Sequence, residues 1–283
     1  MTKSPAAAAE IAPPSNPLPG FNLTLGFSVV YLTLVVLVPI AALALKALGL
    51  SWNDLWILGT NQRALAAYQF SLTASLAAAF INALFGSLLA WVLVRYEFPG
   101  RRFFDGLIDF PFALPTAVAG LTLANLFSAH GWLGRFLVPL GITGAYSRLG
   151  VVIALTFVGL PFSVRTLQPV IETLDVAVEE AAACLGAGRA RTFARVVGPT
   201  LLPAALTGFG LSFARALGEY GSVVFISGNL PGTEIAPTLI VIRLDQYDYT
   251  GAIAVALVLM IFSFALLLTL NTLQGWAARI EEP

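Results

Sequence analysis

Residues 178–199 read VEEAAACLGAGRARTFARVVGP, a polar stretch inside an otherwise apolar second half of the chain. Before and within it, apolar residues recur every three or four positions, the period of one helical face: Ile171, Leu174, Val178, Ala181 and Leu185. Acidic residues follow the same period on another face: Glu172, Asp175 and Glu179. Gly186-Ala187-Gly188 interrupts the pattern, and three arginines follow: Arg189, Arg191 and Arg195. Residues 166–198 are therefore predicted to form a helix–turn–helix with an acidic and a basic arm.

On both sides of this stretch the chain contains long segments without Asp, Glu, Lys or Arg. They are residues 11–45, 64–94, 110–134, 149–164, 196–214, 220–233 and 249–278. A helix needs about 20 residues to cross the roughly 30 Å hydrocarbon layer of a membrane. The 220–233 segment is too short to cross alone, so it is joined to 196–214 across Arg215 and Glu219. Six membrane helices are predicted, at about 21–47, 65–94, 105–128, 149–166, 199–228 and 249–276.

The composition supports an all-α membrane protein. Of 283 residues, 58% are hydrophobic and only 11% are charged, whereas about a quarter are charged in soluble domains. Fifteen basic residues balance fifteen acidic ones, so there is no basic field for nucleic acid. One cysteine, Cys184, and one histidine, His130, exclude a disulfide framework and a Cys/His metal cluster. No metal or cofactor is expected.

The basic residues predict the orientation, because cytoplasmic loops of membrane proteins are enriched in Lys and Arg. With both termini cytoplasmic, nine basic residues lie inside: Lys3, Arg95, Arg101, Arg102, Arg165, Arg189, Arg191, Arg195 and Arg279. Five lie outside: Lys46, Arg63, Arg135, Arg148 and Arg243. We therefore expect a cytoplasmic tail at 1–20, a transmembrane domain at 21–276 and a second cytoplasmic tail at 277–283.

The stretch around Gly186 resembles the coupling loop of binding-protein-dependent ABC importer permeases. That family's motif reads Glu-Ala-Ala-x₃-Gly-x₉-Ile-x-Leu-Pro, and Glu180-Ala181-Ala182, Gly186 and Pro199 keep its spacing. The chain departs from it at Val196, where Ile is usual, and at Gly198, where a larger apolar residue is usual. The resemblance implies a type I ABC importer permease fold whose loop docks on a cytoplasmic ATPase. Glu180 would then be a polar contact or helix-end partner, and Gly186 would form the tight turn.

The alternative for this loop is a plain connector with a solvated acidic face. That reading explains the small-residue run Ala181-Ala182-Ala183 poorly, because small side chains let another backbone come close. The coupling loop is therefore the preferred interpretation.

Three further segments resemble the T-type permeases of sulfate/thiosulfate importers. They are residues 95–101 (RYEFPGR), 109–123 (DFPFALPTAVAGLTL) and 217–229 (LGEYGSVVFISGN). The likeness extends from about Pro19 to Gln274. Molybdate permeases share a variant of the Gly-Glu-aromatic-Gly piece, so a molybdate or tungstate permease remains the alternative within this class, whereas the Pro-Thr-Ala-Val-Ala-Gly run favours sulfate.

The resemblance also implies partners and a location in the bacterial inner membrane. The chain has no G-x-x-x-x-G-K-[ST] motif, so the ATPase is expected to be a separate polypeptide and the chain itself is not expected to be an enzyme. The resemblance implies that this ATPase is a dimer. A second, homologous permease subunit and a periplasmic sulfate-binding protein complete the expected importer. A secondary transporter would not need an ATPase-docking loop, and a membrane enzyme would need a catalytic motif such as H-E-x-x-H or G-x-S-x-G, which the sequence lacks.

Charged residues inside a membrane are costly and usually face a bundle interior or a watery path. Arg215 and Glu219 are four positions apart, so they share a helical face. Two roles stay open for them: lining the path of an oxyanion, or a self-satisfied structural pair. Pro115 and Thr116 are further candidates for the path, because Pro111 and Pro115 each remove a backbone donor and predict a kink. The outer segment 233–249 is predicted to lie as a helix at the periplasmic mouth, as a gate, a landing surface or a lid.

Overall fold

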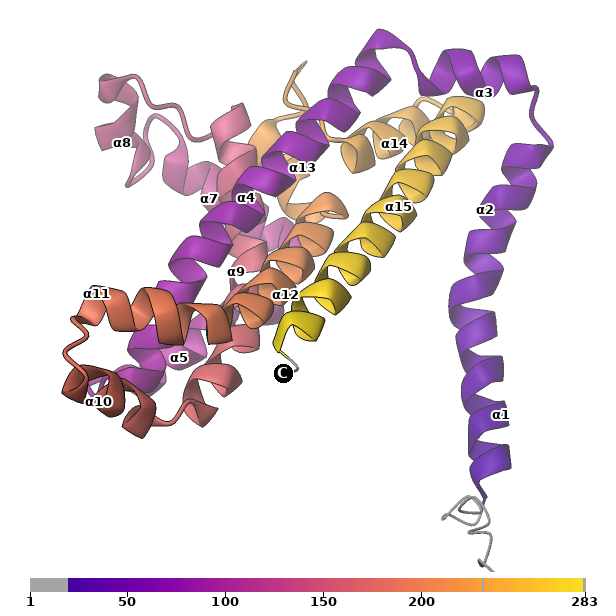
Figure 1. Ribbon diagram of the computed structural model, residues 1–283. Coiled ribbons are helices and arrows are strands. Elements are labelled where there is room, and N and C mark those ends of the chain that lie inside the picture. Colours follow the sequence, from indigo (N-terminus) through magenta and orange to yellow (C-terminus); the bar gives the residue numbers. More distant parts are fainter. Residues whose placement is uncertain (1–19, 231, 282–283) are drawn as a thin grey trace, which may run out of the picture. The chain divides into compact units, whose positions relative to one another are not determined.

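The structure, a computed structural model, describes residues 20–230 and 232–281, whose regular elements are all helical (Figure 1). The chain falls into two units, Met1–Gly49 and Leu50–Pro283. The first contains α1 (Phe21–Leu32), the π-helical turn η1 (Thr33–Leu37) and α2 (Val38–Leu48). Together they form an apolar run of 28 residues, long enough to cross a membrane.

Five helical runs among the described residues are long and apolar enough to be membrane spans: Phe21–Leu48, Gln62–Arg95, Arg148–Thr173, Arg189–Leu217 and Tyr249–Thr269. The chain is thus a multi-span helical protein, as the sequence predicts. The prediction of six continuous spans is wrong in two places, at the third and the fifth helix.

The predicted third helix, 105–128, is three separate helices: α5 (Arg101–Ile108), α6 (Phe110–Ala113) and α7 (Thr116–Phe127). The break before α7 follows from proline chemistry, because Leu114 takes an extended conformation (φ −82°, ψ 133°) directly before Pro115. The prolines therefore end helices here where a kink was predicted. With 12 residues, α7 is only about 18 Å long, too short to cross a membrane alone.

The predicted fifth helix, 199–228, is also divided, into α12 (Gly198–Leu217) and α13 (Gly221–Ser227). At the other end it begins earlier than predicted. The helix starts with α11 (Arg189–Thr192) and passes through the π-helical turn η3 (Phe193–Val197) into α12 without a break. The basic arm of the predicted helix–turn–helix and the following span are therefore one helix of 29 residues. The predicted end at Gly228 is observed, with a φ of 64°.

The fourth predicted helix, 149–166, extends in the structure from Arg148 to Thr173 as α9. The acidic arm is therefore split, because Leu174 leaves the helical conformation and a new helix, α10 (Val176–Cys184), begins after it. Ile171 is buried on α9, whereas Val178 and Leu185 are 48% and 88% exposed. The predicted apolar stripe of residues 171–185 is thus not one buried face.

The helices α4 (Gln62–Arg95), α9 and α12 pack on one another in the centre of the second unit. Asn82 of α4 donates from Nδ2 to Oγ of Ser212 on α12 at 2.9 Å, and both residues are buried. Gly159 of α9 lies against both side chains, and a Cβ there would come within 2.6 Å of the Asn82 amide. Small residues let membrane helices approach closely, and polar side chains join them.

The remaining helices are α3 (Trp52–Gly59), α8 (Gly134–Leu137) with the 3₁₀ turn η2 (Val138–Leu140), α14 (Ala236–Asp245) and α15 (Tyr249–Glu281). The helix α14 lies within the segment 233–249, where the sequence predicts one. In Figure 1, α14 and α3 lie near the start of α4, whereas α10 and α11 lie near its end. Short helices therefore lie at both ends of the long helices of the second unit (Figure 1).

Candidate functional site

The helix α10 is defined by side-chain and backbone caps at its two ends. Asp175 accepts a hydrogen bond from the Ala177 N–H at 2.9 Å and caps the first turn. At the other end Gly186 has a φ of 80°. The Gly186 N–H donates to the Ala183 carbonyl at 2.9 Å and the Ala187 N–H to the Ala182 carbonyl at 3.0 Å, the paired bonds of a Schellman motif. The sequence assigned the tight turn to Gly186, and the structure confirms this.

One partly buried link holds α10 against the end of α4. Arg95, the last residue of α4, donates from Nη2 to the Glu179 carboxylate at 3.0 Å and to the Leu174 carbonyl at 3.1 Å. Its guanidinium also lies 5.3 Å from the ring centre of Trp91, within the range of a cation–π contact. Arg95 therefore fixes both the start of α10 and the turn that precedes it.

The opposite surface of α10 is presented to the surroundings. Glu180 and Ala181 are exposed and Ala182 is half-buried, and no residue of α10 is fully buried. Leu185 at the turn and Phe193 in η3 are large apolar side chains, 88% and 53% exposed. Between α4, α10 and α11 lies a groove of about 820 Å³, lined by Trp91, Glu179 and Phe193 among others. Small, acidic and apolar groups together form a surface suited to contact with another protein.

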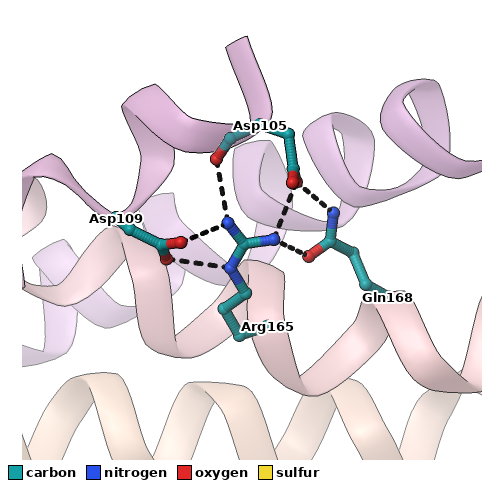
Figure 2. Close-up of polar contacts among 4 residues, drawn as sticks. All are labelled: Asp105, Asp109, Arg165 and Gln168. Atoms are coloured by element: carbon teal, nitrogen blue, oxygen red, sulfur yellow. Dashed lines mark hydrogen bonds and ion pairs between the residues drawn. The ribbon is translucent and has the colours of Figure 1, made fainter. Parts of the chain in front are cut away.

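A second polar cluster joins α5 and α6 to α9 (Figure 2). Arg165 donates to the Asp109 carboxylate from Nε at 2.9 Å and from Nη2 at 2.6 Å. It also donates to the Asp105 carboxylate at 2.7 Å, to the Asp105 carbonyl at 2.8 Å and to the Gln168 amide oxygen at 2.6 Å. These five bonds use all five guanidinium N–H groups. Arg165 thus ties the interrupted third segment to α9.

The Gln168 amide completes this cluster by donating to the Asp105 carboxylate at 2.9 Å. That hydrogen bond, together with the guanidinium of Arg165, holds the pKa of Asp105 below its ordinary value, although partial burial opposes the shift. Asp105 therefore stays ionised throughout the physiological range, and the cluster keeps two carboxylates for one guanidinium.

Arg215 and Glu219 lie at the break between α12 and α13 and form an ion pair. Glu219 is buried, and its Oε1 accepts from the Ser222 N–H at 2.9 Å and from the Ser222 hydroxyl at 3.0 Å. The Arg215 side chain keeps a third of its surface exposed. Both carboxylate oxygen atoms of Glu219 therefore accept hydrogen bonds within the protein, and the carboxylate caps the start of α13.

The two helix breaks lie next to each other. Thr116, the first residue of α7, contacts Gly221, the first residue of α13, so closely that a Cβ at Gly221 would meet the threonine hydroxyl at 2.2 Å. One turn on, Gly120 lies against the backbone of Ser222. The structure thus brings Thr116 beside the Arg215–Glu219 break, while Pro115 is exposed.

Residues 82–279 match the family of the binding-protein-dependent transport system inner membrane component. The chain belongs to this family. It is accordingly a multi-pass inner membrane protein and a transport subunit, in agreement with its apolar helices.

Two relatives of this permease illustrate the likeness. The chain is 52% identical over 254 residues to the "Sulfate transport system permease protein CysT" of Synechococcus elongatus, covering 89% of the chain and 91% of the relative. It is 48% identical over 259 residues to the protein of the same name from Salmonella typhimurium, covering 91% and 94%.

The fold of this permease also has a solved counterpart. The crystal structure of a bacterial ABC transporter involved in the import of the acidic polysaccharide alginate matches with a TM-score of 0.75, over 93% of this chain and 96% of that one. The sequence identity is 16%, so this likeness shows the ABC importer permease fold and nothing about the substrate.

The candidate site residues of the permease form two groups in the structure, one at α10 and one at the two helix breaks. The group at α10 and its turn contains Glu180, Ala181, Ala182 and Gly186, whereas Pro199 lies apart from it, beyond η3 in the continuous helix. Sequence reasoning missed the ion pairs of Arg95 and Arg165, because their acidic partners are 84 and 56 to 60 positions away. Charges at the predicted ends of several spans were the only signal for them.

Proposed function

We propose that this permease is one membrane subunit of an ATP-driven importer of sulfate or thiosulfate. The observation that carries the proposal is the 52% identity, over 89% of the chain, to a protein named as a sulfate transport permease. The match covers the third and fifth predicted helices, where the structure has its two adjacent breaks. In a family that imports different substrates on one fold, such a match favours a shared substrate class.

The surface of α10 and its turn is the proposed docking site for the ATPase. A separate ATPase is needed because the sequence has no phosphate-binding loop of its own. Exposed Glu180 provides a charged contact, and the small residues Ala181 and Ala182 permit close approach. Leu185, 88% exposed at the turn, provides an apolar anchor. Cytoplasmic placement of this end agrees with the nine-to-five distribution of basic residues.

The other proposed partners are a second, homologous permease and a periplasmic sulfate-binding protein. A partner permease follows from the shape of the third segment, since α7 is about 18 Å long and cannot seal a path across the membrane alone. A binding protein follows from the family itself, whose importers depend on one. Selection among tetrahedral oxyanions is then shared between the binding protein and the membrane subunits.

The breaks that hold Arg215, Glu219, Pro115 and Thr116 are the proposed wall of the path. Because Glu219 and Arg215 neutralise each other, a passing dianion meets a polar surface of low net charge. Weak binding of this kind suits transport, because an ion held tightly in mid-membrane would leave slowly.

The substrate is tested with the complete importer in proteoliposomes. ATP-dependent uptake of radiolabelled sulfate is measured alone and against excess thiosulfate, molybdate or tungstate. Sulfate uptake inhibited by thiosulfate supports the proposal. Uptake of molybdate with no uptake of sulfate would identify the alternative substrate and refute it.

Docking is tested separately with Glu180→Lys and Gly186→Val. The first reverses a charge at the proposed interface, and the second places a β-branched residue where φ is 80°. Both are expected to lower the affinity for the ATPase by about ten-fold or more, while the variant proteins still insert in the membrane. Glu172→Lys, at an exposed acid near the end of α9, is the matched control. Equal ATPase binding by all four proteins would show that the loop is only a connector.

A further inference from the structure

The end of the second unit remote from α10 contains a groove with a net positive lining. Its volume is about 740 Å³, and it lies between the start of α4, the start of α9 and the segment that precedes α14. Among the described residues, three charged side chains line it: Arg63, Arg148 and Glu234. Two guanidinium groups therefore share the groove with one carboxylate.

Glu234 is committed to one of these arginines. Arg63 donates from Nε to Oε2 at 2.8 Å and from Nη2 to Oε1 at 2.6 Å, a bidentate pair in which Glu234 is buried and half of Arg63 is exposed. This fork shows that the groove can hold two oxygen atoms of an anion against a guanidinium. It also occupies the acidic group of the lining.

Arg148 is held in place without a counter-charge. Its Nε donates to the Gly232 carbonyl at 2.8 Å, and its guanidinium carbon lies 5.3 Å from the ring centre of Phe70. Within the described part of the chain, neither Nη atom of Arg148 has a hydrogen-bond acceptor. The side chain is thus fixed at its stem while its two terminal nitrogen atoms remain for a ligand.

The backbone adds to the positive charge of this groove. Arg63 and Arg148 stand in the first turns of α4 and α9, helices of 34 and 26 residues with no acidic residue in either first turn. Helix starts favour anions and disfavour cations. Two arginines at two helix starts, with only one carboxylate among the described charged residues of the groove, form an arrangement that an additional anion would stabilise.

We propose that this groove binds a small tetrahedral oxyanion, sulfate in the first instance, before it reaches the helix breaks. Arg148 donates from both Nη atoms to two oxygen atoms of the ion, and Arg63 exchanges one of its bonds from Glu234 to the ion. The proposal rests on the proposed sulfate importer. It places the groove at the outer face, because α9 spans about 38 Å between Arg148 and the end that leads to α10.

The test is equilibrium binding of radiolabelled sulfate to the assembled importer, without binding protein, in phosphatidylcholine nanodiscs at constant ionic strength. Arg148→Gln is expected to weaken binding about ten-fold, because it removes a charge-assisted, bidentate contact. Arg148→Lys, which keeps the charge but loses the fork, is expected to bind with intermediate affinity. Arg135→Gln removes an exposed positive charge outside the groove and serves as the matched control.

A gain-of-binding variant guards against simple misfolding. Glu234→Gln releases Arg63 from its carboxylate, so it is expected to bind sulfate several-fold more tightly than the unmodified importer. Wild-type affinity in Arg148→Gln, or equal losses in Arg148→Gln and Arg135→Gln, would overturn the proposal. The proposal would also be overturned if chloride competed with sulfate as strongly as selenate does, because that result would indicate diffuse electrostatic attraction in place of a specific site.

Two further measurements distinguish a free ion from a lipid headgroup, and the groove from the transport function. If adding phosphatidylglycerol to the nanodiscs abolishes sulfate binding at Arg148, a lipid phosphate is the occupant and the proposal fails. ATP-driven sulfate uptake is measured with the same importer. If the Arg148→Gln importer takes up sulfate at the normal rate and binds it with unchanged affinity, the groove site is refuted and the proposed function stays intact. No sulfate uptake by the unmodified importer would refute the proposed function itself.

Discussion

The contact between α7 and α13 and the helix α10 are built in opposite ways. Gly120 of α7 touches the backbone of Ser222 of α13. Close to this contact, the buried Glu219 carboxylate accepts a hydrogen bond from the Ser222 N–H and forms an ion pair with Arg215. The helix α10 has no fully buried residue and is held by Arg95 through one ion pair and one carbonyl. Direct backbone contact leaves little room for movement between α7 and α13. The exposed helix α10 is held by the bonds of Arg95 and by packing on α11 and η3, so it has more room to move.

The largest effect is expected where the backbones touch. In Gly120→Ala the new Cβ would lie 2.2 Å from the Ser222 carbonyl oxygen, and neither backbone can move without separating α7 from α13. A loss of about 3 kcal/mol in the free energy of unfolding is expected, measured by thermal or denaturant unfolding of the purified protein.

Gly26→Ala is the matched control for this substitution. Gly26 is also a helical glycine, but nothing lies within 4 Å of a Cβ built there, so the change is expected to leave stability unaltered or slightly raised. Equal effects at the two positions would show that the α7–α13 contact is not tight.

The next effect concerns the ion pair at the break. Arg215→Ala leaves the buried Glu219 carboxylate with Ser222 alone, and a loss of about 2 kcal/mol is expected because Arg215 is partly exposed. Glu219→Ala is expected to cost a similar amount, since it also uncaps α13. The double variant should regain part of the stability and still transport sulfate slowly. Full sulfate uptake by the double variant would show that the pair does not line the path. A double variant no more stable than the worse single variant would show that Arg215 and Glu219 are not energetically coupled.

A smaller effect is expected at the tether of α10. Arg95→Ala should lower the local stability of α10 by about 1 kcal/mol, so that its amides exchange with solvent about five-fold faster. Hydrogen exchange measured by mass spectrometry reports this directly, with Glu172→Ala as the control. Unchanged exchange in α10 would mean that the helix is held by contacts other than Arg95.

The smallest effect is a pH dependence at Asp105. Its pKa is lower in the folded protein than its ordinary value of 3.8, so its stabilising contribution is present above that value and is lost as the pH falls through the folded pKa. The difference in unfolding temperature between the wild type and Asp105→Asn should be constant above about pH 5 and shrink below pH 3.8. A difference that grows on acidification would contradict this assignment.

The sequence predicted those features that depend on residues close together along the chain. The apolar segments revealed the long helices, and Gly186 revealed the turn that ends α10. At Pro115 the sequence predicted only a kink, and at Gly218 it predicted no break, because each segment has the length and hydropathy of a single span. The short helices α7 and α13 pack on each other and on α9, and these long-range contacts could not be foreseen from the sequence. The partners of Arg165 could not be predicted, because many registers of α5 against α9 were compatible with the same charges.

The continuity of α11, η3 and α12 has a mechanical consequence. From Arg189 to Leu217 the chain is a rod of about 42 Å, so each degree of tilt about its Arg189 end displaces the other end by about 0.7 Å. The π-helical turn at Phe193–Val197 is the one change of pitch along this rod. A tilt of this rod by a few degrees about the end beside α10 thus displaces Arg215, near the other end, by a distance comparable to the radius of an oxygen atom.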